Sequence, residues 1–184
     1  MRRRCFGLLP GTLAGDRRGA AAVEFAIIAP MFIALVLSIL EAGYFFFVSS
    51  AVDQASARAS RLIRTGQAQS ASTPISRAAF FDEICEVVRH FGDCSQKLTV
   101  DVTRFSDFDA LAADLAAPVC RDADDDAVDA LPYDIGAQRE IVRVRVCFLY
   151  KPINPGLGLD LSEAPDGSRK MISVSIFRNE PFSS

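Results

Sequence analysis

An apolar run near the N-terminus is the feature that most constrains how this chain folds. Phe25–Val48 comprises 24 residues and contains a single charged side chain, Glu41. At about 1.5 Å per residue a helix of that length extends roughly 36 Å, whereas the hydrocarbon core of a bilayer is about 30 Å thick. The run therefore predicts one membrane-spanning helix over residues 25–48.

The charges on either side of the run predict its orientation. Five arginines and one aspartate give residues 1–19 a net charge of +4, although the whole chain carries −3. Basic residues beside a span favour the cytoplasm. We therefore expect residues 1–19 to be a cytoplasmic basic leader and residues 66–184 to be an exported domain, periplasmic or extracellular, of an inner-membrane protein. The acidic remainder has no basic stripe, so nucleic acid is not an expected partner.

The helix is expected to continue beyond the apolar run and to cover residues 20–65. No proline or glycine interrupts Ala51–Arg64, and Gly66 followed by polar residues supplies a stop signal. Pro30 predicts a local kink inside the span. Small and apolar residues recur at alternating spacings of four and three, which predicts a seam that packs against another helix or a sheet: Val48, Val52, Ala55, Ala59 and Leu62.

Downstream of the long helix, the sequence alternates between helical and strand patterns. A helix is predicted over Ser76–His90, with Gly92 as its end, and a pattern like a capping box at Ser106 and Asp109 predicts a second short helix. Alternation of apolar and polar residues predicts three strands, at Leu98–Thr103, Ile141–Tyr150 and Met171–Phe177.

These elements predict an α+β fold, in which a long N-terminal helix precedes a small domain with a three-stranded antiparallel sheet and two short helices. The second half of the long helix is expected to cover one face of the sheet. In the strongest strand, Val142 and Val144 are expected to face the core, while Arg143 and Arg145 point to the other side.

Four of the five cysteines follow the apolar run, and Cys5 stands alone in the leader. Four cysteines permit three disulfide connectivities, and the sequence alone does not choose among them. We favour Cys85–Cys94 with Cys120–Cys147, because the first pair is close across a helix end. A zinc site is disfavoured because the chain has no Cys-x-x-Cys pair and only one histidine.

No residue pattern predicts a catalytic residue, a cofactor or a metal ion. Four aspartates resemble the start of a calcium loop, but Ala127 occupies the position that needs glycine and Tyr133 the position of the closing glutamate. We interpret this stretch as a solvated acidic loop: Asp122, Asp124, Asp126 and Asp129. His90 has no nucleophile elbow or glycine cluster near it, so the chain is not expected to be an enzyme.

The most informative segment runs from Arg17 to Phe25. Gly19 follows a basic pair and precedes small residues, and Glu24 then stands at the cytoplasmic edge of the apolar run. A carboxylate at the edge of hydrocarbon is costly unless it is paired, and such acids usually mark function. Two plainer interpretations remain open: Glu24 fixes only the depth of the helix, and Gly19 is a hinge.

This segment resembles one class of prepilin-peptidase site, in which cleavage follows a glycine, glutamate is the fifth residue of the new chain and an aromatic residue comes next. Gly19, Ala20, Glu24 and Phe25 occupy those positions. With Ala26, Pro30, Ala55–Arg64 and Asn179–Pro181, the chain resembles the TadE-like family of tight-adherence (Flp) pilus assembly proteins. The resemblance is specific over residues 17–65.

The resemblance implies a minor pilin or pseudopilin, with a prepilin peptidase and other pilin or pseudopilin subunits as its partners. Cleavage after Gly19 would create an α-amino group on Ala20, which Glu24 of a neighbouring subunit would neutralise. Glu41 lies roughly 25 Å beyond Glu24 along a helix. We interpret Glu41 as a residue near the periplasmic interface in preference to a packing role.

Two other interpretations also place the C-terminal domain outside the cytoplasm. The first is a periplasmic adaptor or sensor held by an uncleaved single-pass signal anchor. The second is an ordinary cleaved signal peptide with Ala55-Ser56-Ala57 as its site, although the apolar run is too long for it and the site lies well past the run. The N-terminal residue of the mature protein separates the three cases.

Overall fold

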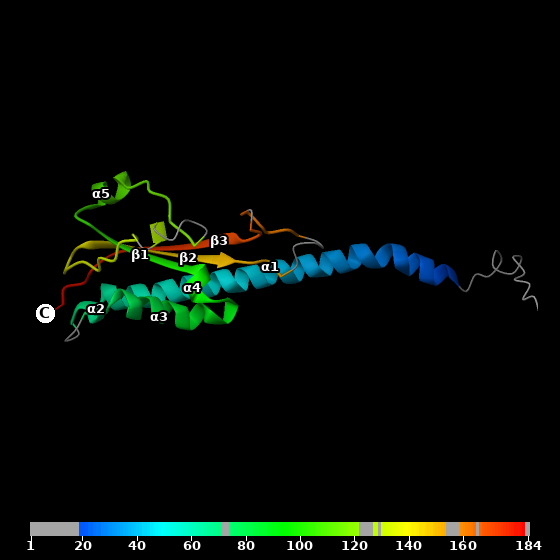
Figure 1. Ribbon diagram of the computed structural model, residues 1–184, viewed down its shortest axis with the longest axis horizontal. Coiled ribbons are helices and arrows are strands. Elements are labelled where there is room, and N and C mark those ends of the chain that lie inside the picture. The colour runs from blue at the N-terminus through cyan, green and yellow to red at the C-terminus, as the bar shows by residue number, and fades with distance from the viewer. Residues whose placement is uncertain are drawn as a thin grey trace, which may run out of the picture.

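The computed structural model describes residues 19–70, 74–121, 127–128, 130–153, 159–164 and 166–182. A long helix runs through the molecule, and a small α+β domain packs along its C-terminal half (Figure 1). The fold class predicted from the sequence is thus confirmed. The basic leader with Cys5, and the four aspartates of the acidic stretch, lie outside the described residues.

The long helix α1 comprises Ala20–Arg64 and continues without a break through Pro30. It ends at Thr65, whose backbone N–H donates to the carbonyl oxygen of Arg61 at 3.0 Å. Gly66 follows with φ at 78°, the left-handed conformation that glycine adopts at helix ends. The stop predicted at Gly66 is therefore correct.

The strands form one antiparallel sheet in the order β1-β2-β3, with β2 in the centre. Their bounds are Leu98–Phe105 for β1, Ile141–Tyr150 for β2 and Arg169–Arg178 for β3. Several short helices accompany the sheet: α2 at Gln67–Ser70, α3 at Arg77–Val88 with a 3-10 turn at Arg89–Phe91, α4 at Cys94–Lys97 and α5 at Phe108–Ala113.

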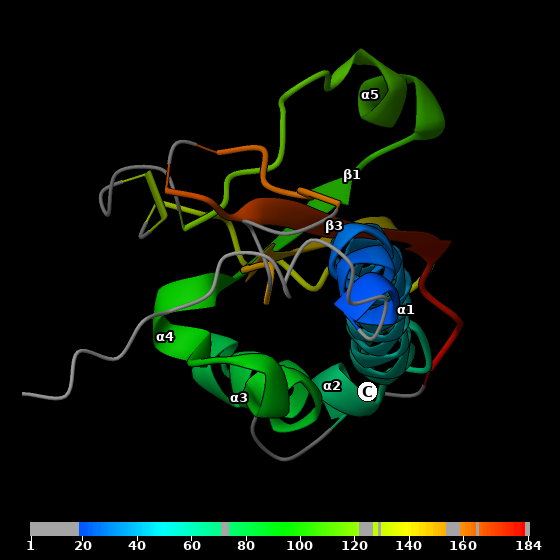
Figure 2. The ribbon, with the colours of Figure 1, turned by 90° about the vertical axis from the view of Figure 1, so that its right-hand side faces the viewer.

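The core lies between one face of the sheet and the helices α1 and α3. An end-on view shows α1 under β3 and α3 farther along the same face, while α5 lies on the opposite side (Figure 2). Valines at alternate positions of β1 and β2 supply the sheet side of the core: Val100, Val102, Val142, Val144 and Val146. Phe80 and Ile84 of α3 are buried against them.

The predicted seam on α1 is correct except at its last position. Val48, Val52, Ala55 and Ala59 are buried, but the next buried apolar residue is Ile63, and Leu62 is only partly covered. An α-helix has 3.6 residues per turn, so a seam with a mean spacing of 3.5 drifts off the contact line. A step of four residues from Ala59 restores it.

The second face of the sheet is more covered than the sequence suggested. Every residue of β2 is buried, including Arg143 and Arg145. Arg143 contacts Asp114 at 2.8 Å, and its guanidinium carbon lies 4.9 Å from the centre of the Phe105 ring. The pKa of Asp114 is lowered, chiefly because the backbone N–H of Ala116 donates to it and also because of Arg143. The expected half-buried strand at β1 is likewise almost fully buried.

The predicted capping box at Ser106 and Asp109 is wrong by one position. Asp107 is the N-cap of α5, and its carboxylate accepts a hydrogen bond from Ala110 N at 2.7 Å. Ser106 instead donates its hydroxyl hydrogen to Asp107. No residue of α5 is buried, and Phe108 is 62% exposed.

Two disulfides tie the domain together. Cys85 of α3 bonds to Cys94 of α4, and Cys120 bonds to Cys147 of β2. These are the two pairs favoured from the sequence. The second disulfide holds the segment after α5 against the second face of the sheet, where Cys120, Cys147 and Leu149 form a small buried cluster.

Candidate functional site

The start of α1 contains the predicted processing residues. Gly19 immediately precedes the helix with φ at −87° and ψ at −9°, and Ala20 is the first helical residue. A Cβ atom added to Gly19 would meet no atom within 4 Å. Neither the backbone conformation nor the packing of the described chain therefore requires glycine at this position.

Glu24 and Phe25 are both exposed on the first turns of α1, and Phe25 is 72% exposed. Residues four apart lie on the same face of a helix, so Glu24 is on the face of Ala20, about 6 Å further along the axis. None of the described residues forms a hydrogen bond or ion pair with the Glu24 carboxylate. This carboxylate is thus presented to whatever surrounds the helix.

The first part of α1 is also bare. No residue of the stretch 20–40 is buried, and the exposed side chains include Phe32, Leu35 and Ile39. These 21 residues extend about 32 Å, close to the thickness of a bilayer core. Among the described helices, α1 is the one that is long and apolar enough to cross a membrane.

The α+β domain reaches the helix earlier than the sequence predicted. It already contacts α1 at Ser38 and Glu41, so the uncovered apolar stretch ends near residue 40, whereas the predicted span ended at 48. Glu41 is buried, with 3% of its surface exposed. The structure therefore gives Glu41 the packing role that the sequence analysis rated below an interfacial position.

Two donors, one at the end of β2 and one three residues beyond it, hydrogen-bond to the Glu41 carboxylate. Tyr150 donates its phenolic hydrogen to one oxygen, and the backbone N–H of Ile153 lies 3.2 Å from both oxygens. Burial, together with the hydrogen bond to Glu41, raises the pKa of Tyr150, so the phenol stays protonated as a donor. The ring of Tyr150 also packs edge-on against Phe45 of α1. Glu41 is thus a buried polar contact between the domain and α1, at the N-terminal end of the packed seam.

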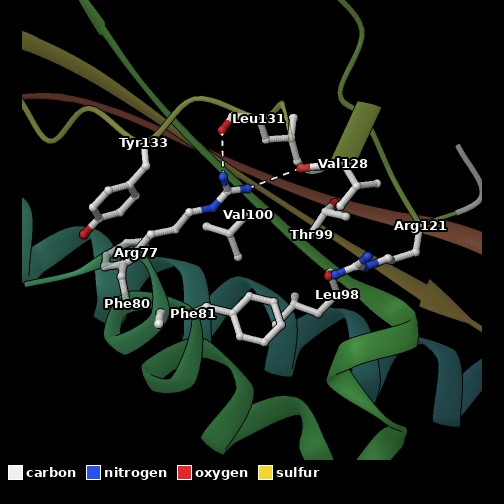
Figure 3. Close-up of a pocket in the computed structure, with 11 residues that line it drawn as sticks. Arg77, Phe80, Phe81, Leu98, Thr99, Val100, Arg121, Val128, Leu131 and Tyr133 are labelled. Atoms are coloured by element: carbon white, nitrogen blue, oxygen red, sulfur yellow. Dashed lines mark hydrogen bonds between the residues drawn. The ribbon is translucent and has the colours of Figure 1, made fainter. Parts of the chain in front are cut away.

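A hollow of about 380 Å³ lies between α3 and β1 (Figure 3). The Arg77 guanidinium extends across it and donates to the carbonyl oxygens of Leu131 and Val128, at 3.0 and 3.3 Å. Tyr133 donates its hydroxyl hydrogen to the carbonyl oxygen of Ile75, and burial raises the pKa of Tyr133 to about 12. These hydrogen bonds join α3 and the residues just before it to the segment that precedes β2.

Other candidate residues do not assemble into a site within the described part of the chain. His90 is exposed in the 3-10 turn that follows α3. In the described ranges, no three side chains of His, Cys, Asp or Glu are placed to hold a metal ion. Ala55 and Ser56, part of the possible signal-peptidase motif, are buried in the core. Cleavage there would remove the core residues Val48 and Val52, which weighs against an ordinary signal peptide.

Comparison of the chain with curated proteins and with solved structures yields no match. A family model described as TadE-like protein matches residues 19–61. The matched segment begins at Gly19 and covers the bare stretch of α1, Glu41 and most of the packed seam. Such a match associates the chain with the membrane and with pilus assembly. The resemblance read from the sequence is thereby confirmed, and this chain carries a TadE-like segment at residues 19–61.

Proposed function

We propose that this protein is a minor pilin or pseudopilin-like structural component of a tight-adherence pilus assembly system, and that a prepilin peptidase cleaves it after Gly19. The observation that carries the proposal is the TadE-like match, which begins at that glycine. The open space around Gly19 supports it, because the chain's own packing does not account for the residue. The proposed role is structural, so it does not require a group of catalytic side chains.

The chemistry of the cleavage explains how the helix would change its environment. Hydrolysis after Gly19 removes the five arginines of the leader and leaves a charged α-amino group on Ala20. The leader arginines hold the N-terminus in the cytoplasm. Without them, the helix end carries one amine and the Glu24 carboxylate. Glu24 of one subunit would then neutralise the Ala20 amine of its neighbour and set their axial register.

The arrangement of the domain supports a low-copy role at a tip or in the assembly platform. The domain buries no residue of α1 before Glu41, touches the helix first at Ser38, and leaves residues 20–37 for a bilayer or for neighbouring helices. A sheet with helices on the outside of every subunit would crowd a thin filament. We therefore place the protein in the inner membrane before assembly, with its N-terminus in the cytoplasm and its domain in the periplasm.

Gly19→Val is expected to abolish processing, because a branched side chain at the scissile position blocks the peptidase. N-terminal sequencing of the protein extracted from membranes is expected to give Ala20 for the parent chain and Met1 for the variant. Gly43→Ala is the matched control: Gly43 lies within α1, the helix that Gly19 precedes, also has open space around it, and its replacement should leave processing unchanged. A parent chain that begins at Met1 would instead support the uncleaved adaptor or sensor.

Glu24→Gln is expected to prevent incorporation into pilus assemblies while leaving cleavage intact. Glutamine keeps the size of the side chain but removes the charge that pairs with the Ala20 amine. Co-purification of the cleaved variant with other pilin subunits measures the effect. Incorporation of the variant at the parent level would contradict the register role of Glu24 without affecting the assignment of the cleavage site.

A further inference from the structure

The end of β2 meets α1 at the depth of a membrane. Figure 1 shows β2 running toward the blue half of α1. Beyond β2, Ile153 N donates to Glu41, and Leu159 N donates to the hydroxyl of Ser38 at 3.0 Å. Ser38 is about 27 Å from Ala20 along the helix, within the roughly 30 Å of a hydrocarbon core. A membrane that covers the bare stretch of α1 therefore reaches these residues.

The side chains at this level are apolar and exposed. Ile153 is 68% exposed and Leu159 is 44% exposed. On α1, Phe46 and Phe47 are 70% and 62% exposed, one to two turns beyond Glu41. We call these four residues the collar. Exposed Phe and Leu side chains are typical of surfaces that insert into the boundary between headgroups and acyl chains, and exposed Lys151 beside the collar suits lipid phosphates.

The backbone N–H groups of Ile153 and Leu159 already have hydrogen-bond acceptors, as an apolar environment requires. A backbone N–H in hydrocarbon costs several kcal/mol when it lacks an acceptor, so non-helical chain is tolerated at that depth only where its polar groups are satisfied. The amides of Ile153 and Leu159 are both satisfied, and their acceptors are side chains of the membrane helix itself. The Glu41 carboxylate is in turn shielded by the domain.

We infer that the collar inserts into the outer leaflet of the membrane, so that the domain rests on the bilayer instead of hanging freely from its helix. Ile153 and Leu159 reach the acyl chains, and Phe46 and Phe47 lie at the headgroup level. The inference rests on the proposed crossing of the membrane by α1, but it does not depend on cleavage at Gly19 or on assembly into a pilus.

Single-tryptophan variants test the inference directly, because the chain contains no tryptophan. Ile153→Trp, Leu159→Trp, Phe32→Trp and Leu115→Trp would each be reconstituted as the full chain in phosphatidylcholine–phosphatidylglycerol vesicles with brominated acyl chains. Phe32 lies in the bare stretch of α1. Leu115 is 89% exposed and comes two residues after α5, the helix that Figure 2 shows on the far side of the sheet from α1. Bromine quenches only a tryptophan that contacts the acyl chains.

We expect Ile153→Trp and Leu159→Trp to show blue-shifted emission and to lose most of their fluorescence in brominated vesicles, as Phe32→Trp does. Leu115→Trp should keep its fluorescence intensity in brominated vesicles and show no blue shift. If Phe32→Trp is quenched while both collar variants behave like Leu115→Trp, the collar does not insert. A blue shift without quenching would show that protein covers the collar, and it also overturns the inference. Failure of Phe32→Trp would instead overturn the membrane crossing.

Discussion

Replacing Asp101 by alanine is expected to lower the free energy of unfolding by about 3–5 kcal/mol, because it leaves the Arg145 guanidinium buried without its counter-charge. Both side chains lie on the second face of the sheet, where they are 5% and 10% exposed. Asp101 accepts hydrogen bonds from Nε of Arg145 at 2.6 Å, from a second guanidinium nitrogen and from the Thr103 hydroxyl. Chemical denaturation of the full chain in detergent micelles, with the disulfides intact, measures the loss.

Arg104→Ala provides a matched control on the same sheet. Arg104 also forms ion pairs, with Asp134 at 3.1 Å and Glu140 at 2.9 Å, but its side chain is 49% exposed. An exposed pair contributes about 0–1 kcal/mol, so this variant should unfold near the parent. Replacing both Asp101 and Arg145 by leucine should recover most of the stability lost in Asp101→Ala. Equal losses for Asp101→Ala and Arg104→Ala would show that burial does not set the strength of the pair.

The buried ion pair also shows why the second face of the sheet could not be predicted. The alternation of valine and arginine in β2 is the pattern of a strand with one face in water, and it predicts the strand and its core face correctly. The sequence does not indicate that the arginines are buried, because the groups that pair with Arg145 are far away in the chain. Its carboxylate partner stands 44 positions away, and its guanidinium also donates to the carbonyl oxygen of Ala116. Such a pairing is a property of the assembled sheet.

The helix ends and the seam show what local sequence does determine. Gly66 marks the end of α1 because a left-handed residue is needed there, and small residues mark the line along which α1 packs. Neighbouring candidates are harder to separate. Ser106 and Asp107 both suit an N-cap, and the choice depends on which backbone N–H each side chain reaches. Leu62 and Ile63 lie on either side of the line through Ala59, about 60° and about 40° from it, so a modest rotation of the helix decides which of them is buried.

The candidate site was predictable where the residues are contiguous. Gly19 and Glu24 stand at a fixed spacing in one short segment, so the pattern is visible in the sequence. The role of Glu41 was missed because its partners, Tyr150 and Ile153, come from the other end of the chain. One signal was available: a single carboxylate in a long apolar run is costly to bury, so a partner must exist.

Glu41→Ala is expected to detach the end of β2 from the membrane helix. The substitution removes the acceptor of the Tyr150 hydroxyl and of the Ile153 amide. The buried Tyr150 hydroxyl is then left without a partner, which costs about 1–3 kcal/mol. Hydrogen exchange at Ile153 should accelerate, and the denaturation midpoint of the detergent-solubilised chain should fall.

Glu41→Gln separates the hydrogen bonds from the charge. The amide oxygen still accepts from Tyr150 or Ile153, so this variant should retain more stability than Glu41→Ala, at the cost of the stronger bonds that an ionised acceptor forms. Glu24→Ala is the matched control, because Glu24 is exposed on the same helix and none of the described residues bonds to it. If Glu41→Ala protects the Ile153 amide as well as the parent does, the fastening of the domain lies elsewhere, in the contacts of Tyr44 and Phe45 with Tyr150.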